Sequence, residues 1–204
     1  MTAIPNADRR AVRHQATIDE ILTAAWDLVR EHGLAGLTLR DLGTRVSMKP
    51  QSLYSYFSSK NDIYDAMFRQ GYTALIEQTA MRMPDELPTD VLPLVQQRAL
   101  LFFDFCTSDP ARYQLLFQRT IPDFTPSAES YQLALQAYDG TIGELAHLRI
   151  TDRSAMDLWT AVMTGLADQQ ISNDPGGTRW RDLVPRAMAM LLDELDTHDD
   201  PTHD

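Results

Sequence analysis

Residues 46–60 read VSMKPQSLYSYFSSK, in a chain of 204 residues with a formal net charge of −11. Two lysines, five serines, a glutamine and two tyrosines surround the large apolar side chains of Leu53 and Phe57. Leu53 and Phe57 are four residues apart, so on a helix they share one face and leave the polar side chains on the others. The stretch therefore predicts a short helix, residues 49–56, that is anchored from behind and presents hydrogen-bonding groups outward.

Helical spacing continues on the N-terminal side of this stretch. A first helix is indicated by an apolar stripe that ends before Gly33, made of Ile18, Ile21, Leu22, Ala25, Leu28 and Val29. A second, residues 38–45, is predicted because Thr38 can cap it, with Asp41 three residues on. A long helix followed by two short ones is the layout of a helix-turn-helix, in which the second short helix enters the major groove of DNA.

The rest of the chain also shows helical punctuation and no alternating strand pattern. Helix starts are predicted at Ser59 with Asp62, and at three pairs, Asp109-Pro110, Thr125-Pro126 and Thr151-Asp152. Residues 173–177, NDPGG, predict a loop. Pro185 either kinks the last helix or marks its start. We expect an all-α protein of about nine helices.

Charge is uneven along the chain, and this limits where a nucleic acid can bind. Residues 1–60 hold eight Lys and Arg against six Asp and Glu, whereas the remaining residues hold ten against twenty-three. An acidic surface repels phosphate, so DNA contact is expected only in the first third. Arg9, Arg10 and Arg13 form either an arm on DNA or a solvated terminus.

Composition also indicates where in the cell the protein is expected and what its cysteine can do. No apolar run approaches the ~20 residues of a membrane span, and the N-terminus lacks the unbroken apolar stretch of a signal peptide. We therefore expect a soluble, cytoplasmic protein without a membrane partner. The single cysteine, Cys106, excludes an internal disulfide and is expected to be a buried, inert thiol.

A family resemblance adds to this interpretation. LYSYFSSK at 53–60, preceded by LTLRDL at 37–42 and ILTAAWDLVREHGLAG at 21–36, resembles the N-terminal domain of TetR-type (TetR/AcrR) transcriptional repressors. The resemblance covers roughly residues 15–65. This chain departs from the family pattern at Val46-Ser47, where a small residue and then glycine are usual, and at Lys49, where a Ser or Thr cap is common.

The resemblance implies a set of DNA contacts. Thr38 would cap the second helix and touch phosphate, and Arg40 would reach a base or phosphate. Residues facing base edges would be Pro50, Gln51, Ser52 and Tyr54. Residues holding the DNA backbone would be Ser55, Tyr56 and Lys60, with Lys49 adding a cation.

The resemblance also implies a domain plan. Residues 1–60 would form the DNA-binding domain and residues 61–196 a ligand-binding and dimerisation domain. The acidic composition of residues 197–204 by itself predicts a disordered tail. The protein would bind a palindromic operator as a homodimer and be released by a small-molecule inducer, with no cofactor or metal. Ligand contacts are expected among Phe102, Phe103, Phe105, Tyr113, Phe117, Tyr131, Tyr138, Trp159 and Met163. Dimer contacts are expected among Trp159, Val162, Leu166, Leu183, Ala187 and Leu191.

Three further interpretations stay open at the level of sequence. Asp104, the one acid in an apolar run, either faces solvent or meets a cationic ligand. Glu144 and His147 have the spacing of a di-iron helix motif, which would make the protein an enzyme, but no second Glu-x-x-His pair is present. A helical adaptor for protein partners is the third class, and it would need a first domain indifferent to DNA.

Overall fold

The computed structural model describes residues 6–80, 86, 88–148, 150 and 153–198. Over these residues the chain forms nine α-helices and two short 3-10 helices, with no strand, which confirms the all-α fold class. It divides into two compact units. The first takes in the chain up to Gly71 together with Gln114–Tyr131; the second takes in Tyr72–Tyr113 and the chain from Gln132 on. The division into a DNA-binding domain, residues 1–60, and a ligand-binding domain, residues 61–196, rests on the family resemblance and not on these contacts, so it stays a prediction.

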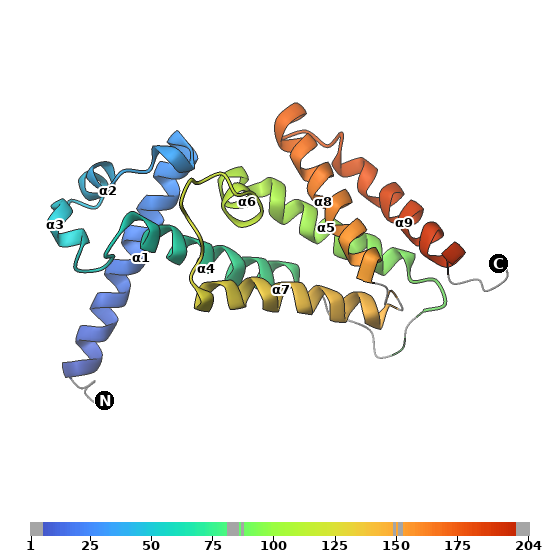
Figure 1. The fold of residues 1–204 in the computed structure, drawn as a ribbon, viewed down its shortest axis with the longest axis horizontal. Helices are drawn as coiled ribbons and strands as arrows, with labels where there is room; N and C mark the ends of the chain where they lie inside the picture. The colour runs from blue at the N-terminus through green and yellow to red at the C-terminus, as the bar shows by residue number, and fades with distance from the viewer. Residues whose placement is uncertain (1–5, 81–85, 87, 149, 151–152, 199–204) are drawn as a thin grey trace, which may run out of the picture. The chain divides into compact units, whose positions relative to one another are not determined.

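The first unit contains the helices around the opening stretch (Figure 1). These are α1 (Asn6–His32), the 3-10 helix η1 (Leu34–Gly36), α2 (Leu39–Arg45), α3 (Pro50–Leu53) and the start of α4 (Lys60–Thr79). α1 begins well before the apolar stripe, so Arg9, Arg10 and Arg13 lie on a helix. α3 is shorter than predicted, because residues 54–56 form a turn that follows Leu53.

Both predicted helix starts beside this stretch are confirmed in detail. The Thr38 hydroxyl accepts the Asp41 N–H at 3.1 Å and donates to the Asp41 carboxylate at 2.6 Å. At the start of α4 the Ser59 N–H donates to Asp62 at 3.0 Å, and the Asp62 N–H donates to the Ser59 hydroxyl at 3.2 Å. Reciprocal caps of this kind satisfy N–H groups that a helix leaves without partners at its first turn.

The turn between α2 and α3 is tight. An added Cβ on Gly43 would lie 2.7 Å from the Met48 carbonyl oxygen, so only glycine allows this approach. The Met48 N–H donates to the Gly43 carbonyl at 2.8 Å. Ser47, at the departure from the family pattern, has φ 55, in the left-handed region where a side chain is unfavourable.

The core of the first unit joins α3 and α4 to α1 and η1. Its buried side chains are Ile21, Leu22, Leu28, Leu34, Leu37, Leu42, Leu53, Phe57, Ile63, Tyr64 and Met67. Within it the Tyr64 hydroxyl donates to the Leu34 carbonyl at 2.5 Å. Near its edge the Trp26 indole N–H donates to Gln70 at 3.1 Å. These two hydrogen bonds fix α4 against α1 and η1.

Later helix starts agree with the sequence only in part. α6 (Pro110–Phe117) begins at Pro110 as predicted, and Asp109 caps it by accepting the Arg112 N–H at 3.2 Å. The start at Thr125-Pro126 is wrong: α7 (Ala128–His147) begins two residues later, because Ser127 accepts the Ser130 N–H at 3.2 Å as its cap. Thr151 and Asp152 lie outside the described residues.

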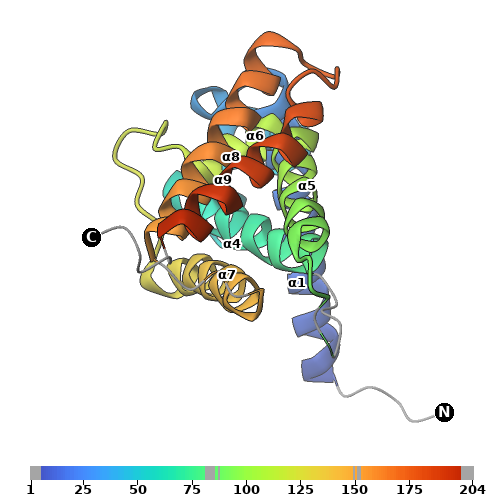
Figure 2. The same cartoon turned by 90° about the vertical axis from the view of Figure 1, so that its right-hand side faces the viewer.

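In the second unit, α5 (Leu92–Ser108), α8 (Arg153–Asn173) and α9 (Val184–His198) pack side by side (Figure 2). α8 ends at Asn173, where the loop is predicted. Pro185 marks the start of α9, which follows the 3-10 helix η2 (Arg181–Leu183) directly. Asp104 is exposed and accepts two hydrogen bonds from Arg181, at 2.7 and 2.8 Å, so the cation it meets is a side chain of its own chain.

The burial of the single cysteine and the hydropathy of the helices can be compared with the expectations from composition. Cys106 is fully buried, and burial raises the pKa of its thiol far above the usual range, which disfavours the thiolate form. No helix within the described ranges is long and apolar enough to cross a membrane.

We predict that Ser47→Gly stabilises the protein by about 0.5–1 kcal/mol, because glycine adopts positive φ without a steric penalty. Ser47→Val should destabilise it, since a β-branched side chain is worse than serine at this φ. Urea unfolding of both variants measures the effect. Equal stability of the glycine and serine proteins would show that the turn is unstrained.

Burial raises the pKa of Tyr64 to about 12. The folded state therefore favours the neutral hydroxyl. The contribution of Tyr64 to the free energy of unfolding is complete below about pH 10, where the side chain is neutral in both states. It is lost as the pH rises toward 12, because the unfolded side chain ionises first. Wild type should lose about 1 kcal/mol more free energy of unfolding between pH 8 and 11 than Tyr64→Phe does. The same pH loss in both proteins, measured by urea unfolding, would contradict this assignment.

Candidate nucleic-acid interface

The exposed side of α2, α3 and the following turn forms the candidate interface. Leu53 is 1% exposed and Phe57 8% exposed, so both face the core as the sequence predicts. Tyr54, between them, is 54% exposed. Of the predicted DNA contacts, those exposed to solvent are Thr38, Arg40, Lys49, Pro50, Gln51, Ser52, Tyr54 and Ser55, and those that are half-buried are Tyr56 and Lys60. The structure thus brings the predicted set to the surface of one small region.

Local hydrogen bonds limit what two of these side chains can do. The Thr38 hydroxyl donates its proton to Asp41, so its capping role is clear and its contact with phosphate stays a prediction. The Ser55 hydroxyl donates to the Ser52 carbonyl at 2.6 Å, which leaves its oxygen as an acceptor. A hydroxyl has one proton and two lone pairs, so each can still accept a hydrogen bond from a base edge.

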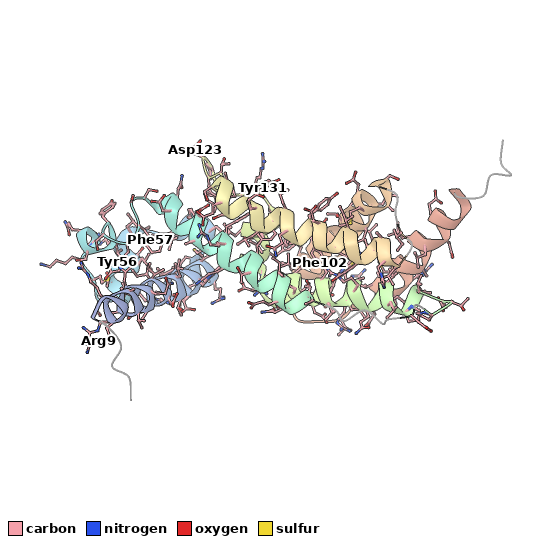
Figure 3. The ribbon with its side chains drawn as sticks, turned by 90° about the horizontal axis from the view of Figure 1, so that it is seen from below. Arg9, Tyr56, Phe57, Phe102, Asp123 and Tyr131 are labelled. Carbon is pink, nitrogen blue, oxygen red and sulfur yellow. The ribbon has the colours of Figure 1, made fainter. Side chains whose placement is uncertain are left out.

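α1 supports the interface at Tyr56, which lies beside this helix (Figure 3). The His14 ring stacks on the Tyr56 ring, with centroids 4.9 Å apart and planes 19° apart. Arg10 and Arg13 precede His14, and Arg9 lies near the beginning of the helix. The sequence alone did not indicate His14. Its only signal was its place four residues before Ile18, on a helix that continues toward the N-terminus.

The cations of the region differ in availability. Arg45 donates to both carboxylate oxygens of Glu31, at 2.8 and 2.6 Å, and this hydrogen bonding holds the pKa of Glu31 below its usual range. Arg40 and Lys49 have no acidic partner among the residues that the structure describes. Lys60 lies over the Tyr64 ring, 5.2 Å from its centroid. The exposed side chains of Arg40 and Lys49 therefore supply positive charge that no described carboxylate neutralises.

The candidate ligand contacts fall into two groups. In the second unit the buried members are Phe102, Phe103, Phe105, Tyr113, Trp159 and Met163. Phe117 and Tyr131 belong to the first unit, and Tyr131 is 51% exposed at the start of α7 (Figure 3). Tyr138 lies on the surface of α7. The structure therefore buries six of the candidates within the second unit, where Tyr138 is exposed, and places Phe117 and Tyr131 in the first unit.

The candidate dimer contacts differ in exposure, and their role stays a prediction. Trp159 is 3% exposed and packs against Phe102, with ring centroids 5.1 Å apart, so it has almost no surface to offer a second subunit. Leu191 is also buried. The others are half-buried or exposed: Val162, Leu166, Leu183 and Ala187. Two further apolar side chains on α8 and α9, Leu158 and Met190, are exposed and were not among the candidates.

The di-iron motif is not arranged for metal binding. Glu144 accepts a hydrogen bond from Arg98, and His147 is exposed. Within the described part of the chain no three metal-binding side chains come together.

Comparison with known proteins agrees with this site. Residues 21–67 match the family model for bacterial regulatory proteins of the tetR family. An uncharacterized HTH-type transcriptional regulator of Mycobacterium bovis is 40% identical over 62 residues, which is 28% of this chain and 29% of that protein. The match therefore spans less than a third of the curated relative.

Solved structures extend the likeness to most of the chain. A TetR family transcriptional regulator, PfmR from Thermus thermophilus, has a TM-score of 0.61 at 16% identity over 85% of this chain and 97% of its own. A single-residue variant of TetR from Acinetobacter baumannii, solved in complex with minocycline, has a TM-score of 0.58 at 18% identity over 88% and 96%. Identities this low show a shared fold. Residues 21–67 therefore match the helix-turn-helix segment of the tetR family, and the chain as a whole shares the fold of these solved structures.

Proposed function

We propose that this protein is a ligand-responsive transcriptional regulator, in its simplest form a cytoplasmic repressor. It binds a palindromic operator as a homodimer and leaves the DNA when a small-molecule inducer binds. The observation that carries the proposal is the face of α3 and its following turn, where polar side chains stand outward while Leu53 and Phe57 are buried behind them.

The chemistry of that face suits base edges. Gln51 can make paired hydrogen bonds to adenine, Ser52 can bond to several bases, and Pro50 can contact the thymine methyl group. Arg40 and Lys49 supply cations for phosphates, which position the protein without reading sequence. Such contacts release counterions, so binding should weaken steeply as salt rises.

A homodimer supplies the second recognition element that a palindrome requires. Two copies of α3 would need to lie about 34–36 Å apart, one turn of DNA. Exposed and half-buried apolar side chains on α8, η2 and α9 support this face as the dimer surface, and we assign to it Leu158, Val162, Leu166, Leu183, Ala187 and Met190.

A polar joint in the first unit links α7 to α4. Asp65 of α4 accepts three hydrogen bonds: from the Ser127 N–H at 2.6 Å, the Ser127 hydroxyl at 2.9 Å and the Ser130 hydroxyl at 2.7 Å. Arg69 adds an ion pair with Glu129 at 3.1 Å. We assign this joint the task of passing inducer binding to the recognition face, because α4 begins directly after the turn that follows α3.

The inducer need not distort the protein itself. It shifts an existing equilibrium by its different affinities for the two forms, and moving a population from 1:99 to 99:1 takes about 5.5 kcal/mol. A joint of charged and hydrogen-bonded groups favours discrete arrangements over gradual bending, which suits a switch between two spacings.

Tyr54→Ala should weaken operator binding by about 1–3 kcal/mol per site and leave the melting temperature unchanged, because an exposed side chain contributes little to folding. Anisotropy titration on DNA flanking the protein's own gene, at two salt concentrations, measures the affinity. Tyr138→Ala is the matched control, an exposed tyrosine on α7, and should bind like wild type. If both variants bound the operator with equal affinity, α3 and its following turn would not be the recognition element.

Asp65→Asn should break the joint while keeping the size of the side chain, because an amide offers only one acceptor oxygen in place of the carboxylate's two. The Ser127 amide hydrogen should then exchange with solvent faster, since it loses a charge-assisted hydrogen bond. Amide hydrogen exchange followed by NMR tests this, with Asp27→Asn on α1 as the control. Unchanged protection of Ser127 would exclude the joint.

A further inference from the structure

A buried polar cluster lies between α5, α7 and α8 of the second unit. Arg98 of α5 is 4% exposed, and its guanidinium reaches two partners on α7. Its Nε donates to the Glu144 carboxylate, and one Nη donates to the Thr141 hydroxyl at 2.8 Å. Its other nitrogen, Nη1, is buried and meets no acceptor among the described residues.

A second donor without an acceptor stands beside it. The Arg98 guanidinium carbon lies 5.9 Å from the centre of the Trp159 ring, on α8. The Trp159 Nε1 is also buried and finds no acceptor in the described part of the chain. Two buried N–H groups, one on α5 and one on the contacting helix α8, are thus without an acceptor among the described residues.

Unmet donors in an interior are costly. Each loses its hydrogen bonds to water on burial, about 1–3 kcal/mol, unless a partner replaces them. A guanidinium and an indole N–H donate and never accept. The missing partner must therefore be a hydrogen-bond acceptor, either an ordered water or an atom of a bound molecule.

Charge and apolar surroundings narrow the class of that molecule. Glu144 already neutralises Arg98, so a carboxylate ligand would add a buried negative charge without compensation. Neighbouring side chains on α5 and α8 are apolar: Phe102 packs on Trp159, and Ala99 and Met163 are fully buried. An uncharged acceptor on an apolar body fits both conditions.

We propose that the effector of this protein is an uncharged, largely apolar molecule whose carbonyl oxygen accepts hydrogen bonds from Arg98 Nη1 and Trp159 Nε1. The inference rests on the proposed function, because it names the chemical class of the inducer and places its polar end. It does not depend on the DNA contacts of α3.

The test uses the full chain and two matched probe pairs. Acetylnaphthalene carries a carbonyl and ethylnaphthalene does not; methyl octyl ketone is uncharged and decanoate is an anion of similar length. Binding is measured by calorimetry, and the Trp159 indole N–H is followed by NMR, assigned by its loss in Trp159→Phe. At least one ketone should bind more tightly than its partner and shift the Trp159 resonance.

Trp159→Phe keeps an aromatic ring and removes the donor, so it should weaken ketone binding about 3- to 10-fold. Trp26→Phe, in the first unit, is the control and should leave binding unchanged. The NMR shift in wild type remains informative if Trp159→Phe is poorly folded.

Three outcomes would overturn the proposal. The Trp159 resonance could stay in place under every probe, which would mean that ordered water alone meets the two donors. Decanoate could bind in preference to both ketones, or Trp159→Phe could fold and bind ketones as wild type does. Operator binding by the same preparation, tested separately, shows whether the proposed function stands when this inference fails.

Discussion

The burial of Leu53 and Phe57 is the constraint on which the candidate interface depends. α3 is a single turn of helix, too short to be stable alone, so it depends on Leu53 and the nearby Phe57 being removed from water in the core of the first unit, where α3 packs against α2. The same burial turns Tyr54 and its polar neighbours outward. Gly43 and the strained Ser47 then set the angle between α2 and α3, where an ordinary side chain at position 43 would collide with backbone.

Polar contacts serve a different purpose in the first unit. The Asp65 joint and the stacking of His14 on Tyr56 involve charged groups or partly exposed rings, and such contacts add little stability compared with apolar burial. They are directional, however, and they fix which groups of neighbouring segments face each other. The proposed function needs both properties: an apolar core that holds the turn after α3 and a polar joint between α4 and α7.

The second unit departs from the usual composition of an interior. Arg98 is buried with Glu144 and Thr141, although an apolar side chain of similar volume would fill the space without a desolvation cost. The cluster is accordingly better explained by what it binds than by stability. The buried aromatic residues around it, which the sequence suggested as ligand contacts, supply the apolar part of the same environment.

The sequence by itself determined the helix-turn-helix: the caps at Thr38 and Ser59 and the spacing of Leu53 and Phe57 are local signals, readable over four residues. Tertiary structure alone decided what depends on distant segments. The pairing of Arg98 with Glu144, the placing of Ser127 on Asp65 and the burial of Trp159 join positions tens of residues apart. No periodic pattern in the sequence encodes such pairs. Helical spacing decides which face of its own helix a side chain lies on, whereas the packing of the helices decides which residue lies opposite.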